Sequence, residues 1–573
     1  MNWLQIAIFA GLVVVSVEPC GNFVFASLNG EGRVAHFLAP AELWIYRLAG
    51  VDSDKEQSWT EYAFALLMFN FVGILVLYGL LRLQGMLPLN PQHLRAVPPD
   101  LALNVAVSFA TNTSWQSYAG ESTLSYLTQM AGITPQMFVS GATGIAVAMA
   151  LVRGLARHSA RTIGNFWVDI TRATLYVLLP LALVASLFLV FLGVPQTIGP
   201  YVHAVTLEGS KQLIALGPVA SQEAIKLLSG DGGGFFNANS AHPFENPTAL
   251  SNLVEVFLMF LIGAGLTYTF GRMVKDQRQG WALFAVMAGL FLAGLFVVYQ
   301  SESAGNPLLA PLGISQTQSP LQSGGNMEGK EVRFGIGQSA LFATVSTASS
   351  DGAVNAMHDS FMPYSFMPLS GLILMTNMML DEVVVGGPGS GLFGMLLFVI
   401  LAVFAAGLMI GRTPEYLGNK IEAAEIKMTM LALLCVPAVT LGFTAIAAVA
   451  PVGLYTLGNS GPHGYSEILY AFTSGTATNG SSFAGLGTNT TFYNLLLAAA
   501  MFCGRFLVIV PVLCIAGSLA SKKVVPASEG TLPTHGALFA GFLAVTILIM
   551  GGLTYLPALS LGPVTEYFQL EAK

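Results

Sequence analysis

Long apolar segments alternate with short polar connections along most of the 573-residue chain. Crossing the hydrocarbon core of a bilayer as a helix takes roughly 20 residues. Nine segments come near that length: 3–26, 62–83, 134–152, 168–192, 249–270, 281–299, 428–449, 491–517 and 538–557. A tenth, from Phe366 to Ile410, is cut by "DEVVVGGPGSG", whose glycines and proline cannot hold a regular helix. The pattern predicts an all-α polytopic membrane protein with ten transmembrane helices, one of them broken.

The composition agrees with a membrane protein. Hydrophobic residues make up 54% of the chain and charged residues only 9%, whereas a soluble domain has roughly 25% charged residues. The net charge of −7 is spread over the loops and indicates no nucleic-acid partner. The four cysteines lie in apolar contexts without a CxxC pair, so we expect neither a disulfide nor a zinc site.

The lysines and arginines set the expected orientation. With the N-terminus outside, connections 27–61, 153–167, 271–280, 411–427 and 518–537 face the cytoplasm and hold 14 of the 23 basic residues. These residues are Arg33, Arg47, Lys55, Arg153, Arg157, Arg161, Arg272, Lys275, Arg278, Arg412, Lys420, Lys427, Lys522 and Lys523. The bias matches the excess of basic residues in cytoplasmic loops, so we expect the N-terminus to lie outside.

Four of the outer connections share one layout. Each has a short, half-apolar helix, then a polar stretch rich in glycine or amides, then a full span; they lie within residues 103–132, 224–252, 340–360 and 473–489. The last, "TSGTATNGSSFAGLGTN", contains no charged residue. Gly232, Gly352 and Gly480 stand 120 and 128 residues apart, which suggests a fourfold repeat.

The repeat divides a single membrane domain, 1–573, into six parts. We expect a first span and loop, four units of helix, re-entrant loop and helix around one pore, and a last span. Their predicted bounds are 1–60, 61–160, 161–275, 276–415, 416–522 and 523–573.

Four polar loops at membrane depth suggest a cation pathway. Irregular backbone is tolerated there only where protein buries it or water lines it. Around one axis, backbone carbonyls could replace the hydration shell of a cation, as in potassium channels, and glycine supplies the positive φ values this needs. The alternative, ordinary glycine-rich surface loops, stays open for any single copy and is weakened by their common layout.

Nucleotide chemistry is not indicated. The stretch "GSGLFG", Gly389–Gly394, fits GxGxxG by letter but follows no strand, so we interpret it as a helix hinge. The chain contains no GxxxxGK[ST] and no Asp-Lys-Thr-Gly sequence. We therefore expect no ATP hydrolysis by this chain.

The motifs of these loops and their flanks resemble a known family. "AVSFATNTSWQSYAGESTLSY", "GGGFFNANSAHPFENPTAL", "GAVNAMHDSF", "GLMIGRTPEYLGNKIE" and "NGSSFAGL" are similar to the potassium-binding A subunit of the bacterial Kdp potassium-transporting ATPase, nearly from end to end. The resemblance implies a non-catalytic inner-membrane component of the superfamily of potassium transporters. It implies potassium as the transported ligand with no cofactor, and the P-type ATPase chain (the B subunit) together with the small C and F subunits as partners. Potassium would be captured outside and passed to the ATPase chain through an intramembrane tunnel.

Carried over residue by residue, the resemblance gives a filter. The first strand is Thr111, Asn112, Thr113 and Ser114 with Gln116 above it; the second is Gly230, Asp231 and Gly232 with Asn239 as a wall residue; the third is Ser350, Asp351 and Gly352; and the fourth is Thr478, Asn479 and Gly480.

Three of these positions depart from the pattern of that family. Ser114 stands where an amide is found, and Asp231 and Asp351 replace uncharged residues. Either carboxylate could raise cation affinity at the outer mouth, or it could hydrogen-bond behind the strand; the sequence leaves both open.

Charges inside apolar segments are a second lead, because they are expensive there and face a cavity or a partner. Arg505 in "AAMFCGRFLVIV" could oppose simple conduction below the filter, or it could hold carbonyls of a neighbouring loop. Glu382, at the break in the seventh span, could gate the pore or line a tunnel, or it could cap a helix. We expect Arg412 to anchor the chain or contact the ATPase partner.

The sequence therefore predicts the potassium-binding, selectivity-filter subunit of an ATP-driven importer. The alternative is an autonomous potassium channel or ion-coupled symporter of the same superfamily. A secondary transporter of organic solutes would instead need polar side chains converging from broken helices.

Overall fold

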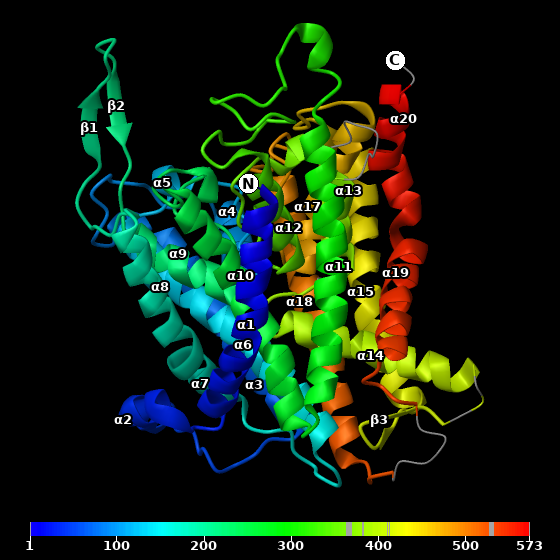
Figure 1. Ribbon diagram of the computed structural model, residues 1–573. Coiled ribbons are helices and arrows are strands. Elements are labelled where there is room, and N and C mark those ends of the chain that lie inside the picture. The colour runs from blue at the N-terminus through cyan, green and yellow to red at the C-terminus, as the bar shows by residue number, and fades with distance from the viewer. Residues whose placement is uncertain are drawn as a thin grey trace.

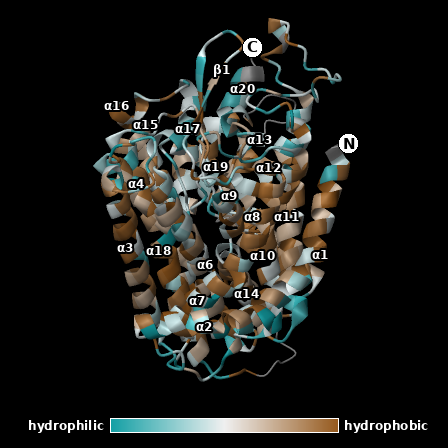
Figure 2. Cartoon of the chain, turned by 90° about the vertical axis from the view of Figure 1, so that its left-hand side faces the viewer, coloured by the Kyte–Doolittle hydropathy of each residue, from teal (hydrophilic) through white to brown (hydrophobic). Residues whose placement is uncertain are grey.

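The computed structural model is an elongated helical bundle, drawn in Figure 1. It describes residues 2–361, 370–380, 383–409, 411, 413–525 and 532–571. The prediction of ten spans is confirmed, because ten helices or helix runs in the described residues are long and apolar enough to cross a membrane. Figure 2 shows hydrophobic residues through the middle of the bundle and more hydrophilic ones at its two ends.

The long helices coincide with the predicted spans. They are α1 (Asn2–Leu28), α3 (Trp59–Leu83), α6 (Thr134–Ala156), α7 and α8 (Phe166–Arg172 and Leu179–Phe191, joined by the π-helix Ala173–Leu178), α10 (Ala249–Met273), α11 (Gln277–Ala304), α14 (Ser390–Met409), α15 (Ala423–Val449), α18 (Thr491–Ser521) and α19 (Ala537–Leu559). In α6, 83% of the most apolar window is buried, whereas in the last span only 17% is. α6 is therefore central and α19 peripheral.

Four shorter helices enter the bundle from one end and stop inside it. They are α4 (Pro99–Ala110), α9 (Val219–Ser229), α12 (Gly335–Ala348) and α17 (Gly461–Ala477). Each is followed by one of the four predicted polar loops. Long helices pack around them; for example, α18 passes so close to the end of α17 that a β-carbon on Gly504 would overlap the carbonyl oxygen of Thr476. The layout of short helix, loop and span is thus present four times.

The seventh span is broken, as the sequence indicates. α13 (Ser370–Met379) and α14 are separate helices, and the segment Val383–Gly389 between them lies inside the bundle. In Figure 1 much of α14 runs across the bundle and not along it. Asp381 and Glu382, at the break itself, lie outside the described residues.

The remaining elements lie mostly at the two ends. They are α2 (Gly32–Ala49), α5 (Gly120–Thr123), α16 (Pro451–Leu454) and α20 (Thr565–Glu571); the hairpins β1–β2 (Val202–Val205, Lys211–Ile214) and β3–β4 (Glu415–Tyr416, Asn419–Lys420); and short 3₁₀ helices at Gln84–Met86, Asn239–Ala241, Ala310–Leu312 and His358–Phe361 and π-helices at Thr128–Ile133 and Ser560–Val564. The hydropathy pattern predicted neither α2 nor the β1–β2 hairpin, because both lie in connections between the spans that this pattern detects.

Candidate functional site

The four loops have the same backbone conformation. In each, two residues separated by one have positive φ: Asn112 (62°) and Ser114 (54°), Gly230 (63°) and Gly232 (52°), Ser350 (63°) and Gly352 (79°), Thr478 (62°) and Gly480 (101°). Positive φ is uncommon outside glycine, so its recurrence at one spacing fixes the register of the loops. Ser114 occupies the position that is glycine in the other three. Alternating backbone handedness turns successive carbonyls to one side, which is the arrangement of a carbonyl-lined ion filter.

The loops touch one another in a ring. A β-carbon on Gly232 would overlap the carbonyl oxygen of Asp351 in the third loop, and one on Gly352 would overlap that of Asn479 in the fourth. A β-carbon on Gly480 would overlap the carbonyl oxygen of Thr113 in the first loop. The contacts run second to third, third to fourth and fourth to first, so the four loops surround one axis.

The fourth contact, between the first and second loops, is made by side chains. The Ser114 hydroxyl donates to Asp231 at 2.9 Å, and Ser140 of α6 donates to the same carboxylate at 2.9 Å. The Asn112 amide donates to the carbonyl oxygen of Gly230 at 2.6 Å. Ser114 therefore makes a hydrogen bond where the other loops place a glycine against a carbonyl.

Three residues between the positive-φ positions, Asp231, Asp351 and Asn479, direct their side chains behind the loops. Asp231 receives the two hydroxyls above, and Asp351 accepts from the backbone N–H of Ala353 at 3.2 Å. The Asn479 amide donates to the carbonyl oxygen of Ser346 at the end of α12, at 3.0 Å. In this geometry the two aspartates hold backbone and hydroxyl groups of the filter wall.

Gln116 and Asn239 both support the second loop. The Gln116 amide exchanges two hydrogen bonds with the backbone of Gly234, each 3.0 Å long. The Asn239 amide donates to the carbonyl oxygen of Gly233, and its oxygen accepts from the backbone N–H of Val354 in the third loop at 3.3 Å. Asn239 thus spans two loops just outside the filter strands.

A buried lysine stands behind these two loops. Lys226 of α9 is fully buried, and its ammonium lies 2.8 Å from Glu223 and 3.1 Å from Glu245. It also donates to Asn239 at 2.9 Å, and Glu245 accepts from the backbone N–H of Phe236 at 2.8 Å. Removing one partner of such a buried ion pair leaves an uncompensated charge and is strongly destabilising. The cluster therefore fixes Asn239 and the backbone that follows the second filter strand.

The seam between the third and fourth loops is neutral. Tyr470 of α17 lies 2.8 Å from the ring nitrogen Nδ1 of His358 and 2.8 Å from the hydroxyl of Ser481. The Ser481 hydroxyl donates to Asn479 at 2.6 Å. Aromatic and hydroxyl groups therefore hold the third and fourth loops together, whereas charged groups hold the second and third loops at the Lys226 cluster.

The broken span contacts the ends of the short helices α9 and α12. The N–H of Gly386 donates to the carbonyl oxygen of Ala348, the last residue of α12, at 2.8 Å. A β-carbon on Gly230 would lie 2.9 Å from Pro388. The segment between α13 and α14 therefore supports the ends of two half-helices.

Arg505 lies beside the same region. It is buried, and its guanidinium donates to the carbonyl oxygen of Ser140 at 3.1 Å. A cavity of about 40 Å³, enough for roughly one water molecule, is lined by Arg505, Thr478, Ser390 and apolar residues of α14, α15 and α18. Glu382 and Arg412, the other two charges singled out in the sequence, lie outside the described residues.

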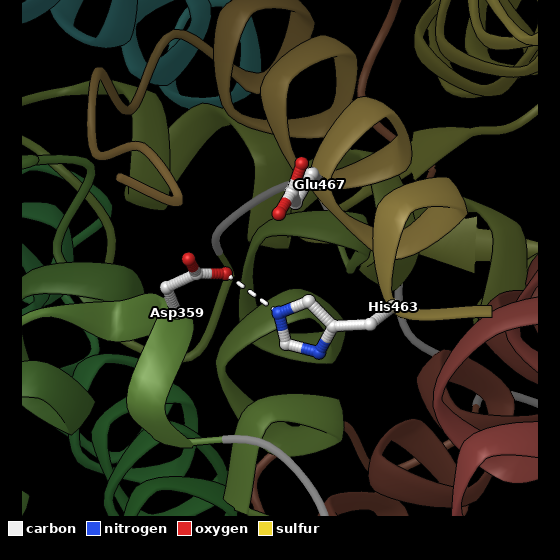
Figure 3. A group of neighbouring side chains, drawn as sticks. All are labelled: Asp359, His463 and Glu467. Atoms are coloured by element: carbon white, nitrogen blue, oxygen red, sulfur yellow. Dashed lines mark hydrogen bonds and ion pairs between the residues drawn. The ribbon is translucent and has the colours of Figure 1, made fainter. Parts of the chain in front are cut away.

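A second cluster of charged side chains lies at the end of the bundle from which the four short helices enter. Asp359, His463 and Glu467 place one ligand atom each within 4.8 Å of one another (Figure 3). Both ring nitrogens of His463 are already engaged, Nε2 at 2.9 Å from Asp359 and Nδ1 at 2.9 Å from Glu566 of α20. Burial opposes charge on this ring, but the two hydrogen-bonded carboxylates outweigh it and raise the pKa of His463 to about 10. The cluster is therefore an ion-paired imidazolium that ties α20 to α17.

Sequence reasoning predicted the four polar loops, which the structure brings together in one ring, and missed the side chains that support them. Lys226 and Lys330 lie outside the predicted spans, yet both ammonium groups are buried and paired, Lys330 with Glu302 at 2.8 Å. A lysine within the apolar run "AIKLL" was the available signal for Lys226. His463 and its carboxylates, from three separate segments, carried no local signal.

Fold and site together define a class of protein: a polytopic membrane protein built around a ring of four re-entrant loops. A solved structure, the potassium transporter TrkH from Vibrio parahaemolyticus, aligns with a TM-score of 0.50 at 15% identity and covers 89% of this chain and 98% of that one. The similarity shows that the fold is that of TrkH.

Sequence comparisons give the family. The family model described as potassium-transporting ATPase A subunit matches residues 7–568. The potassium-transporting ATPase potassium-binding subunit of a Methylorubrum extorquens strain is 60% identical over 99% of this chain and 97% of that protein. The protein of the same name from Rhodopseudomonas palustris is 59% identical over 100% and 99% of the two chains. The chain belongs to the family of potassium-transporting ATPase A subunits.

The His463 ion pairs predict a pH-dependent stability. The folded-state pKa of about 10 lies above the unfolded value of 6.5, so their stabilisation is complete below pH 6.5 and is lost as the pH rises through 10. We expect His463→Gln to lower the midpoint of thermal unfolding in detergent more at pH 6 than at pH 10. The control is His203→Gln on the exposed β1 strand, and a pH-independent deficit in His463→Gln would contradict the assignment.

The Ser114–Asp231 contact predicts energetic coupling between the first two loops. A hydrogen bond contributes about 0.5–1.5 kcal/mol between neutral groups and about 1.5–3 kcal/mol where one partner is charged. In a double-mutant cycle of Ser114→Ala and Asp231→Asn, we expect a coupling energy of about 1–3 kcal/mol in the free energy of unfolding of the full chain.

The matched cycle pairs Ser114→Ala with Asp351→Asn, whose carboxylate bonds Ala353 in the third loop. The two changes are expected to add within about 0.5 kcal/mol. Equal coupling in both cycles would mean that Ser114 and Asp231 do not interact specifically.

Proposed function

We propose that this chain is the potassium-binding, filter-forming subunit of an ATP-driven potassium importer. It takes potassium from the outer side of a bacterial inner membrane and passes it to a P-type ATPase partner. The N-terminus and the four half-helices lie on the outer side, which agrees with the excess of basic residues in the opposite loops. ATP hydrolysis belongs to the partner chain.

One observation carries this proposal, the ring of four loops with alternating backbone handedness. Backbone carbonyls can replace the hydration shell of potassium without any side-chain charge. The half-helices add to this, because the C-terminal end of a helix carries partial negative charge and all four end where a filter strand begins. The relatives are named potassium-binding subunits of potassium-transporting ATPases.

The filter residues are proposed as the potassium site. Carbonyl groups of Thr111–Ser114, Gly230–Gly232, Ser350–Gly352 and Thr478–Gly480 would contact the ion, and Gln116 and Asn239 would hold the wall in place. Asp231 and Asp351 act behind the strands, which their hydrogen bonds support.

The exit from the filter is sideways in this proposal. Arg505 places a positive charge beside the inner end of the ring, which opposes straight conduction of a cation. The small cavity beside it, between α14, α15 and α18, is a candidate start for the tunnel to the ATPase chain. The C and F subunits are the further partners that the family resemblance implies. Glu382 as a gate and Arg412 as a partner contact remain proposals from the sequence.

A dependence on partners separates the pump subunit from an autonomous channel. We expect cells that lack potassium uptake to grow at micromolar potassium when this chain is expressed with its partner ATPase subunits, and not when it is expressed alone. Copurification of a P-type ATPase chain is the matching biochemical result. Growth of cells that express the chain alone would favour the channel or symporter alternative.

The glycine contacts of the ring predict ion selectivity. Gly480→Ser forces a side chain against the carbonyl oxygen of Thr113, a strain of about 1–3 kcal/mol, and Gly232→Asp does the same against Asp351. We expect both variants to raise the KM for potassium uptake roughly tenfold or more and to admit rubidium, ammonium or sodium more readily.

The control is Gly289→Ser in α11, where a β-carbon meets nothing within 4 Å. Its potassium KM and selectivity are expected to equal those of the unaltered chain. Unchanged selectivity in both loop variants would show that these strands are not the filter.

A further inference from the structure

The helix α2 begins almost directly after α1 at the end of the bundle opposite the half-helices. Only Asn29, Gly30 and Glu31 separate the two helices, so α2 starts within roughly 10 Å of the point where the chain leaves the bundle. Figure 1 shows α2 lying across the long axis of the molecule, beside the lower ends of α1 and α7. α1 has 27 residues and is about 40 Å long, which exceeds the hydrocarbon core of a bilayer. Its end, and therefore α2, lies at the level of the membrane–water interface.

One face of α2 is fixed against the bundle. Ala35, Glu42 and Tyr46 are buried on it. Glu42 accepts hydrogen bonds from Tyr46 at 2.7 Å, from Tyr176 at 2.5 Å and from the guanidinium of Arg172 at 2.7 Å. The acidic side chain of the helix is therefore turned inward and neutralised, and α2 cannot rotate without breaking a buried ion pair.

The opposite face is apolar and exposed. Phe37 is 82% exposed, Trp44 63% and Leu48 68%. These three are spaced by seven and four residues, which puts them on one stripe of the helix. Basic side chains border the stripe along one edge: Arg33, His36 and Arg47, all exposed. A helix facing water would not gather large apolar residues in this way.

A hollow continues the same surface. About 590 Å³ of space opens between the end of α2 and the beginnings of α3 and α7. Phe64, Met68 and Trp167 line it with apolar surface, and Asp52, Lys55 and Glu61 line it with charged groups. Because its acidic side chains outnumber the lysine, the hollow offers space for part of an acyl chain at interface depth, and the anionic headgroup is left to the basic edge of α2.

We propose that α2 is an interfacial helix that binds anionic phospholipid, with Phe37, Trp44 and Leu48 among the acyl chains and Arg33 and Arg47 on the phosphates. Amphipathic helices with aromatic residues on one face and basic residues at its border lie in the interface in this way. Basic residues near an anionic surface strengthen its attraction for the helix. A protein partner would need an acidic surface against the same edge, and the depth fixed by the short connection to α1 favours lipid.

Trp44 provides a direct test. The full chain is placed in nanodiscs of phosphatidylcholine with a fixed fraction of brominated phosphatidylglycerol or brominated phosphatidylcholine, and the fluorescence of Trp44 is obtained as the difference between the unaltered chain and Trp44→Phe. We expect Trp44 to be quenched by both brominated lipids, and severalfold more by phosphatidylglycerol. Absence of quenching by either lipid, with quenching by acrylamide instead, would overturn the proposal.

Two comparisons separate the contribution of the basic residues from that of the apolar face, and lipid from a protein partner. Arg33→Gln with Arg47→Gln is expected to remove the preference for phosphatidylglycerol while leaving quenching by phosphatidylcholine; the control is Lys275→Gln, an exposed basic residue at the same end. Equal quenching by the two lipids in the unaltered chain would disprove the anionic preference. Repeating the measurement on the chain purified with its copurifying subunits tests a protein partner, since loss of quenching on assembly would show that protein covers α2.

Discussion

The approach of each loop to the carbonyl of the next is the contact on which the ring depends. Gly232, Gly352 and Gly480 each have a positive φ and each lie where a β-carbon would overlap a carbonyl oxygen of the next loop. Where one loop backbone packs directly against another, neither can move to make room for a side chain, because protein interiors are closely packed and respond to a single added methyl group. The four half-helices must therefore end at one depth, and the long helices around them keep them there.

The support behind the ring differs from loop to loop. The second and third loops share Asn239, which the buried Lys226 and its carboxylates hold in place. The third and fourth loops share the neutral chain of His358, Tyr470 and Ser481. A buried ion pair contributes little net stability but is costly to break, so the Lys226 cluster fixes one arrangement of its loops. The four loops therefore share one pattern of positive φ values but are supported by different side chains.

The spans and the four polar loops could be predicted from sequence because their signals are local. Hydropathy over about 20 residues gave the ten spans, and glycine at a repeated spacing gave the register that the positive φ values of Gly232 and Gly480 confirm. The supporting contacts could not be predicted, since Lys226 meets Glu245 19 residues away and His463 meets Glu566 103 residues away. Helix α2 was not predicted because only one of its faces is apolar, and a search for membrane-spanning segments does not detect such a helix.

Ser114 is where the ring becomes linked to a buried carboxyl group. It has the positive φ of the other three positions but carries a hydroxyl, and Asp231 is the acceptor that this hydroxyl uses. The same carboxylate is held by Ser140, whose carbonyl oxygen accepts from Arg505. The guanidinium is thereby linked through Ser140 of α6 to the seam between the first and second loops, whereas in each of the other three seams a glycine lies against a carbonyl oxygen of the neighbouring loop. A serine at this position and an aspartate in the neighbouring strand form one structural unit, and a substitution of either changes the environment of the other.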